Sequence, residues 1–233
     1  MREVISPNVK AILDIRVPDL DPFNYHCTIN NGVIVATPTI PLVSNIVQTA
    51  FDAYEDAGQL YNVGVTGLPI DNGVGSVRFC NWQRRLADNI TTIVDKLGCV
   101  ELVKGRDDTW HQFEECSKYF RWMKYANGGQ HFPHYDSDWV FPYDKSLATL
   151  YTMIIYWTDC NTGELAFVND PRGEGVTSDW ERQATEEEIR LKVKPVTGRI
   201  VMFPHHMCHT VLPYTDNGQR IITRGDLIFR KVA

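Results

Sequence analysis

A histidine and an aspartate separated by one residue are the first side chains in this sequence whose types and spacing suggest chemistry. In His134-Tyr135-Asp136, residues i and i+2 of a strand point to the same face, so one metal ion could lie between the imidazole and the carboxylate. The chain has seven histidines, and at that frequency a tripeptide of this kind often arises by chance. The rest of the sequence must therefore decide whether the pair is a metal site.

Further candidate ligands follow much later in the chain. His205, His206 and His209 lie close together, and Arg220 comes after them. Two histidines and one carboxylate on one face of Fe(II) form a facial triad, which leaves three coordination positions for a bidentate co-substrate and dioxygen. A third ligand from a distant strand, followed by an arginine, fits such a centre. The residue types alone leave the choice among the three histidines open.

The order of the motifs resembles that of the prolyl-4-hydroxylase-like branch of the Fe(II)/2-oxoglutarate-dependent dioxygenases. That branch has a tyrosine, a glycine-rich turn and HxD, then a strand ending in Tyr-Leu-Asn, a Gly-Gly-Glu-type turn, a strand ending in Phe, and His-x-Val-x-Pro followed by Lys or Arg. The matching segments are Tyr125, Gly128-Gly129, His134 with Asp136, 155–159, 162–167, 198–204 and 209–220. The chain departs from the pattern at Thr162 and Trp157, and by two extra residues between the last histidine and the arginine. None of these departures touches the candidate triad.

The resemblance implies a role for each matching residue. Iron would be bound by His134, Asp136 and His209, while His205 and His206 would lie on a loop or at the rim of the pocket. The side chains that bind or line the 2-oxoglutarate site would be Arg220, which grips the distal carboxylate, and Tyr125, Tyr156, Thr152 and Ile154. A guanidinium can hold a carboxylate through two charge-assisted hydrogen bonds, which a lysine cannot.

Three further residues are candidates for contact with the substrate: Arg224, Arg121 and His131. In a strand Arg224 shares a face with Arg220, so it either enters the barrel or pairs with Asp226; we favour the interior position. The charges of Fe(II), Asp136, 2-oxoglutarate and Arg220 cancel, so another buried arginine would need an anionic partner. We therefore expect a substrate with an anionic group near the reacting carbon.

The function that the resemblance implies is hydroxylation of an unactivated C–H bond of an amino acid, a peptidyl residue such as proline, or a small metabolite, with release of succinate and CO2. Its cofactors would be Fe(II), 2-oxoglutarate and O2, with ascorbate as a reductant. The same scaffold also performs halogenation, desaturation and cyclisation; Asp136 disfavours halogenation, because halogenases of this superfamily typically replace that carboxylate with a small residue. A non-catalytic, cupin-like metal-binding module is the alternative from another class. The net charge of −6 disfavours nucleobase repair or any other nucleic-acid partner.

The elements that must position these residues are mostly strands. Runs rich in β-branched and aromatic residues predict strands at 118–125, 147–157, 163–168, 192–203 and Arg220–Lys231. Apolar residues at helical spacing predict a helix from about 42 to 54 and another from Trp82 to Leu97, ended by Gly98. The polar segment 171–190 could contain a short helix that starts at Thr185. We predict an α+β, mainly β fold: a double-stranded β-helix, or jelly roll, with N-terminal supporting helices.

Composition limits the remaining possibilities. The chain of 233 residues is 43% hydrophobic, enough for one folded unit, which we divide into helical or mixed support (1–110) and the catalytic β-helix (111–233). The longest stretch without charges, 23–51, is too polar to cross a membrane, and no secretory signal is evident. The six cysteines are scattered, which indicates reduced thiols in a cytoplasmic protein. The substrate and the oligomeric state are left open.

Overall fold

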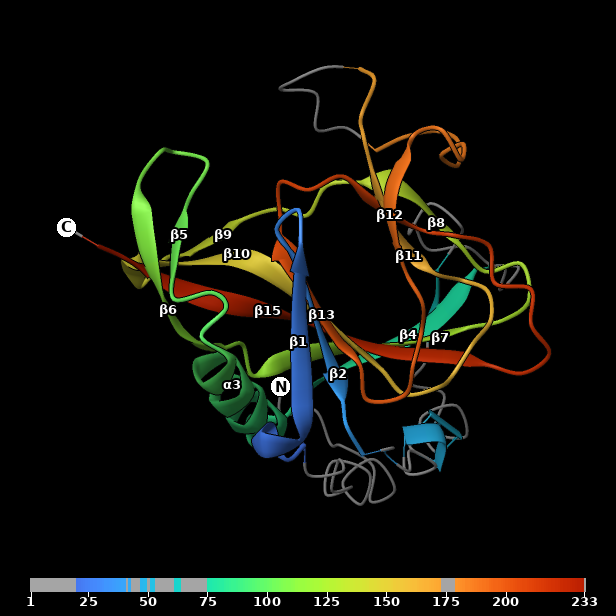
Figure 1. Cartoon of the computed structure of the whole chain (residues 1–233), viewed down its shortest axis with the longest axis horizontal. Helices are drawn as coiled ribbons and strands as arrows, with labels where there is room; N and C mark the ends of the chain where they lie inside the picture. The colour runs from blue at the N-terminus through green and yellow to red at the C-terminus, as the bar shows by residue number, and fades with distance from the viewer. Residues whose placement is uncertain are drawn as a thin grey trace, which may run out of the picture.

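A computed structural model of the chain describes residues 20–40, 42, 47–49, 51–52, 61–63, 75–172 and 179–232. Two antiparallel sheets dominate it (Figure 1). The major sheet has eleven strands: β1 (Tyr25–Asn30), β2 (Val33–Pro38), β3 (Tyr61–Val63), β4 (Ser76–Trp82), β5 (Leu102–Lys104), β6 (Trp110–Cys116), β7 (Tyr119–Tyr125), β9 (Trp139–Phe141), β10 (Asp144–Tyr156), β13 (Ile200–Pro204) and β15 (Arg220–Lys231). The minor sheet has four: β8 (His131–His134), β11 (Leu165–Val168), β12 (Ile189–Val193) and β14 (His209–Val211). The mainly β jelly-roll prediction is confirmed.

Strand β10 lies near the centre of the major sheet, between β13 and β15, and its side chains alternate between two cores. Met153 and Ile155 belong to the core that also contains the buried residues of the helix. Ile154 and Tyr156 belong to the core that lies between the two sheets. Because successive side chains of a strand point to opposite faces, the last part of β10, Thr152–Tyr156, is buried on both sides.

The helix α3 (Arg84–Leu97) covers the outer core of the major sheet. Its buried residues are Leu86, Ala87, Ile90, Ile93 and Val94. It ends at Gly98, which adopts a left-handed conformation (φ 56°) and donates its N–H to the carbonyl of Val94 at 3.0 Å. Glycine is suited to this position because it lacks a Cβ atom. This helix is confirmed, except that Trp82 ends β4 instead and is 64% exposed.

The first hundred residues contribute more strands than the sequence indicated. Strand β2 pairs with β13, and β4 pairs with β7, so both extend the major sheet. Both strands are short, with six residues in β2 and seven in β4, so no long periodicity marks them in the sequence. The helix predicted near 42–54 lies partly outside the described residues; residues 47–49 and 51–52 are helical. The 3-10 turn η1 (Pro22–Asn24) leads into β1.

Two predicted elements are wrong. The run at 192–203 is not one strand, because β12 ends at Val193 in the minor sheet and β13 begins at Ile200 in the major sheet. Thr185 starts a turn and not a helix: the N–H of Glu188 donates to its carbonyl at 3.1 Å. A helix cannot continue there, because Ile189 already pairs with Val168 of β11.

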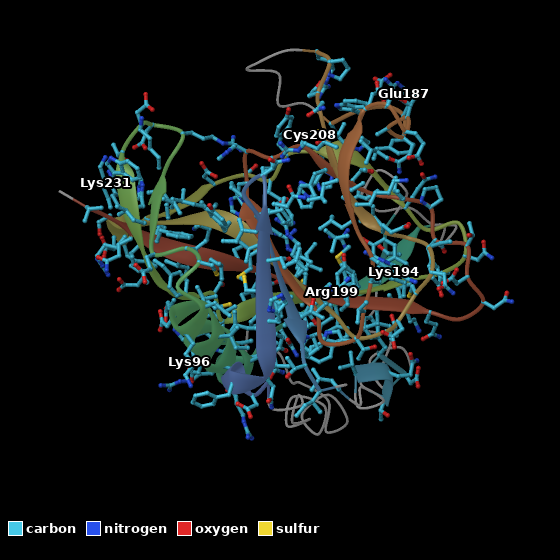
Figure 2. The ribbon with its side chains drawn as sticks, in the orientation of Figure 1. Lys96, Glu187, Lys194, Arg199, Cys208 and Lys231 are labelled. Atoms are coloured by element: carbon cyan, nitrogen blue, oxygen red, sulfur yellow. The ribbon has the colours of Figure 1, made fainter. Side chains whose placement is uncertain are left out.

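The described part of the 171–190 segment packs against the minor sheet. The backbone N–H of Trp180 donates to the carbonyl of Pro133 in β8 at 2.9 Å. Gln183 donates to the carbonyl of Val211 in β14 at 3.0 Å. In Figure 2, Glu187 lies at the outer edge of the molecule above this sheet. The segment therefore braces the two strands that carry the candidate histidines.

All six cysteines lie in described segments and are free thiols, as the sequence indicated. Among the described residues, no helix is both long enough and apolar enough to cross a membrane.

Candidate metal centre

His134, Asp136 and His209 come together at one end of the minor sheet. His134 ends β8, His209 begins β14, and the two are directly paired in the antiparallel ladder. Their ring centroids are 4.3 Å apart, and the Nε2 atom of His209 lies 3.6 Å from Oδ2 of Asp136. One potential ligand atom from each residue lies within 4.8 Å of the others, and all three residues are enclosed. The arrangement is suited to one metal ion.

Backbone carbonyls orient both imidazoles. The Nδ1 atom of His134 lies 2.8 Å from the carbonyl oxygen of Phe132, and Nδ1 of His209 lies 3.0 Å from that of Met207. An Nδ1–H donor to a carbonyl leaves Nε2 deprotonated and available to a metal. Both rings therefore present the same atom to the centre.

The protonation states also suit a metal. Burial, followed by the neighbouring His209, lowers the pKa of His134 to about 3. Burial likewise lowers the pKa of His209. Burial raises the pKa of Asp136, but Arg224 and the two histidines outweigh it, so this pKa lies below its usual value. At neutral pH the site offers two neutral imidazoles and one carboxylate, which are the forms that bind metal ions.

Two residues of the major sheet hold the carboxylate of Asp136. The hydroxyl of Thr152, on β10, donates to Oδ2. The Nη2 atom of Arg224, on β15, lies 2.6 Å from Oδ1. Arg224 is 18% exposed and also lies 3.7 Å from Asp226. The sequence offered two alternatives for Arg224, an interior position or a pair with Asp226, and the structure shows both at once.

Arg220 is completely buried at the start of β15, and none of its three guanidinium nitrogens has a hydrogen-bond partner among the described residues. The guanidinium carbon lies 4.7 Å from the ring centroid of Tyr125 and 5.5 Å from that of Tyr156. The hydroxyl of Tyr156 likewise has no hydrogen-bond partner within the described part of the chain. A buried charge without a partner is costly, so this group of donors is suited to an anionic ligand.

A small cavity of about 50 Å³ adjoins the two histidines. Its lining includes most of the residues that the sequence analysis expected near the co-substrate or the substrate. They are Tyr125, His131, Thr152, Ile154, Arg121 and Arg224. The ring of His131 lies 4.1 Å from that of His134, so His131 is next to the candidate ligand.

A larger cleft of about 620 Å³ opens on the other side of Asp136. Arg121 and Arg224 line both spaces, so the cleft and the small cavity meet at these two arginines. In Figure 2, Cys208, the residue before His209, is labelled in the upper half of the view. The metal centre is therefore buried, with the cleft as an approach to it.

The sequence placed His205 on a loop or at the rim of the pocket, and this prediction is wrong. His205 is 1% exposed, with Nδ1 3.2 Å from Asp138 and Nε2 3.5 Å from Asp226. The carbonyl of His205 accepts the N–H of Asp136 at 3.2 Å. Its position follows from β13, which carries the chain into the interior directly before it. His206 is exposed, as expected.

Three residues around the centre were not expected from the sequence. Arg78 lines the small cavity from β4, Arg106 donates to the carbonyl of Asp136 at 3.0 Å, and Asp138 pairs with His205. Val77 and Phe79 flank Arg78 in the sequence, and this strand-like alternation was the available signal for Arg78. Arg106 and Asp138 lie in irregular segments, where no periodicity exists to place a side chain.

Comparison with known proteins gives a consistent result. Residues 120–225 match the model of the 2OG-Fe(II) oxygenase superfamily, where 2OG is 2-oxoglutarate. Among solved structures, the carbocyclase SnoK from nogalamycin biosynthesis has a TM-score of 0.50 at 15% identity, over 85% of this chain and 79% of that one. The likeness to SnoK shows the fold. No curated protein sequence matches the chain.

Two prolyl hydroxylases are also among the similar structures. A prolyl-4-hydroxylase from Pseudomonas putida has a TM-score of 0.47 at 17% identity, over 84% of this chain and 92% of that one. A prolyl hydroxylase from Trichoplax adhaerens, in complex with a peptide of a hypoxia inducible factor, has a TM-score of 0.48 at 15% identity, over 85% of this chain and 84% of that one. The superfamily indicated by the motif order is confirmed by the family match.

Proposed function

Because the chain belongs to the 2OG-Fe(II) oxygenase superfamily, we propose that it binds Fe(II) through His134, Asp136 and His209 and hydroxylates an unactivated C–H bond. The observation that supports this most strongly is the buried group of three ligand atoms, with both Nε2 atoms left available. When bound, iron and 2-oxoglutarate would supply an oxidant that is able to break a C–H bond, while the co-substrate is converted to succinate and CO2.

Arg220 is the proposed anchor for the distal carboxylate of 2-oxoglutarate. Its guanidinium has donors without partners, and the hydroxyl of Tyr156 beside it is a further donor. Tyr125, whose ring packs against the guanidinium of Arg220, lines the small cavity beside the two histidines together with Thr152 and Ile154. The side chains present therefore fit a dicarboxylate whose other end reaches the metal.

The remaining polar residues keep the ligands in position. Thr152 and Arg224 bind separate oxygens of Asp136, so the carboxylate cannot rotate freely. The low pKa of Asp136 keeps it ionised. Because all three ligands are buried, bulk water would be kept away from the ligand atoms that hold the metal.

The motif order places the chain nearest to the prolyl-4-hydroxylase-like branch, so peptidyl proline is one substrate class to test, with free amino acids and small metabolites as the others. A second outcome is cyclisation, since SnoK, whose fold this chain shares, is a carbocyclase. Halogenation is disfavoured, because Asp136 supplies the third ligand and is held by two neighbours.

The test is a mass-spectrometric screen of peptide and metabolite pools, run with Fe(II) and labelled dioxygen, with and without 2-oxoglutarate. Hydroxylation predicts products that have gained one labelled oxygen atom, only when 2-oxoglutarate is present. Products that have lost two hydrogens, without added oxygen, would support cyclisation or desaturation instead. A chlorinated product would contradict the assignment of Asp136 as an iron ligand.

A further inference from the structure

The larger cleft is lined by one arginine, Arg121, that no carboxylate of the described lining contacts. Its lining carries three acidic residues besides Asp136, and each has a basic partner among the described residues. Glu115 pairs with Lys118 at 2.6 Å. Asp138 lies 3.2 Å from His205, and Asp226 lies 3.5 Å from the same ring. Arg224 is neutralised by Asp136 at 2.6 Å.

Arg121 is the cation that remains. No hydrogen bond or ion pair joins its guanidinium to any of the described residues that line the cleft, and it is only partly exposed. Arg224, which is directly paired with Arg121 across β7 and β15, repels its charge, and Asp226 and Asp136 attract it less strongly. Arg224, and then burial, lower the pKa of Arg121, which indicates how unfavourable its charge is in this position. A partly buried arginine beside another arginine is costly unless an anion binds there.

We propose that Arg121 binds the carboxylate of the substrate in this cleft, which rests on the function proposed above and narrows it to an organic acid. Arg224 touches Asp136, so an anion on Arg121 would hold the substrate immediately beside the metal ligands. The lining already carries four carboxylates against three basic side chains, so a carboxylate with its single negative charge is better suited to Arg121 than a phosphate, which carries about −1.5 to −2 at neutral pH. Arg121 would position the substrate and take no part in the chemistry.

The rest of the cleft indicates the body of that acid. Aromatic side chains form much of its lining: Trp82, Tyr119, Trp139, Phe141 and Tyr143. Trp82 is 64% exposed and Trp139 is 61% exposed, so their rings are available to a ligand. A volume of about 620 Å³ lies within the roughly 300–1,000 Å³ of small-molecule sites. The cleft is therefore suited to a small carboxylic acid with a flat, apolar body, since aromatic faces stack favourably on planar rings.

The experiment compares two probes that differ in charge but hardly in shape, indole-3-acetate and indole-3-acetamide. Their dissociation constants are measured by calorimetry on the whole protein, loaded with Mn(II) and 2-oxoglutarate so that no turnover occurs. The parent protein should bind the acid about 10- to 100-fold more tightly than the amide. Arg121→Gln should remove this preference, and Arg121→Lys should keep part of it.

Lys118→Gln is the matched control, because Lys118 is a cation of the same cleft that is already paired with Glu115. This variant should keep the full preference for the acid. Equal binding of acid and amide to the parent, or a preference that survives Arg121→Gln, would overturn the proposal. Displacement of 2-oxoglutarate by the acid would also overturn it, since Arg121 would then bind the co-substrate.

A failure of the proposed anion site can be distinguished from a failure of the proposed function. If the protein takes up neither Mn(II) nor 2-oxoglutarate, the proposed function fails, and the acid and amide are then compared on the metal-free protein. A preference there that depends on Arg121 would still support the anion site.

Discussion

The ligands of the candidate triad are held by two kinds of partner. The imidazoles of His134 and His209 are oriented by carbonyls two residues earlier in the chain. Asp136, which follows β8, is instead held by side chains from β10 and β15. Local backbone geometry thus positions the histidines, and contacts between the two sheets position the carboxylate. Loss of any of the three should affect the metal more than the fold.

Replacement of His209 by alanine should abolish iron-dependent turnover and lower the affinity for Fe(II) by more than about 100-fold, the upper range for loss of a residue that only supports a ligand. Alanine at His134 or Asp136 should have the same effect. Metal content and turnover are the measurements. The control is His206→Ala, at a neighbouring exposed histidine. If His209→Ala were fully active, the third ligand would have to be His205 or His206.

Arg220→Leu should raise the concentration of 2-oxoglutarate needed for half-maximal rate sharply, because a buried charge pair is worth about 2–5 kcal/mol. The affinity for Fe(II) should change little. Arg230→Leu is the matched control on the same strand, where the arginine pairs with Glu114 and Asp144 near the surface. An unchanged requirement in Arg220→Leu would transfer the anchoring role to Arg224.

At the scale of elements, the turn before β11 supports the co-substrate site. Gly163 has φ +74°, and a Cβ atom there would lie 2.9 Å from Cδ of Arg220. Gly128 has a similar φ of +82°, but a Cβ atom there would meet nothing within 4 Å. The two glycines therefore separate the cost of backbone conformation from the cost of crowding Arg220.

Gly128→Ala should cost about 1–2 kcal/mol of stability, the price of a left-handed conformation for a residue with a Cβ atom, and leave the apparent affinity for 2-oxoglutarate unchanged. Gly163→Ala should lower the stability further and should also weaken the binding of 2-oxoglutarate, because the side chain of Arg220 must move away from the new Cβ atom. Urea denaturation and the half-saturating concentration of 2-oxoglutarate measure the two effects. Equal affinities in the two variants would show that Gly163 does not position Arg220.

The sequence predicts elements best where one periodicity persists. The helical stripe from Leu86 to Val94 and the long apolar strand β10 were predictable for this reason. The run at 192–203 is continuous in sequence, yet its two halves pair with different sheets, which only long-range contacts decide. His205 could not be placed from its neighbours either, because its partners Asp138 and Asp226 come from distant segments.

At the scale of the whole molecule, strand pairing joins the segment before residue 110 to the rest. β2 pairs with β13, β4 pairs with β7, and α3 covers the outer core of the major sheet. Two independent units would have their own cores, whereas this outer core draws residues from both parts of the chain.

We therefore predict that the chain unfolds in a single transition. Tryptophan fluorescence and far-ultraviolet circular dichroism should give the same midpoint in urea, because Trp122 and Trp157 are buried in the core that the helix shares. Two separated transitions would contradict a single unit. A chain shortened to 111–233 should fail to fold, since it lacks β2, β4 and α3.

The central claim is that this buried triad supports oxidation driven by 2-oxoglutarate. The most direct measurement is the amount of succinate formed from 2-oxoglutarate in air, with and without Fe(II), in the presence of the metabolite and peptide pools. The parent protein should form succinate only with Fe(II), and Asp136→Ala should form none. If the parent bound Fe(II) and 2-oxoglutarate yet formed no succinate, or if Asp136→Ala formed as much as the parent, the claim would be contradicted.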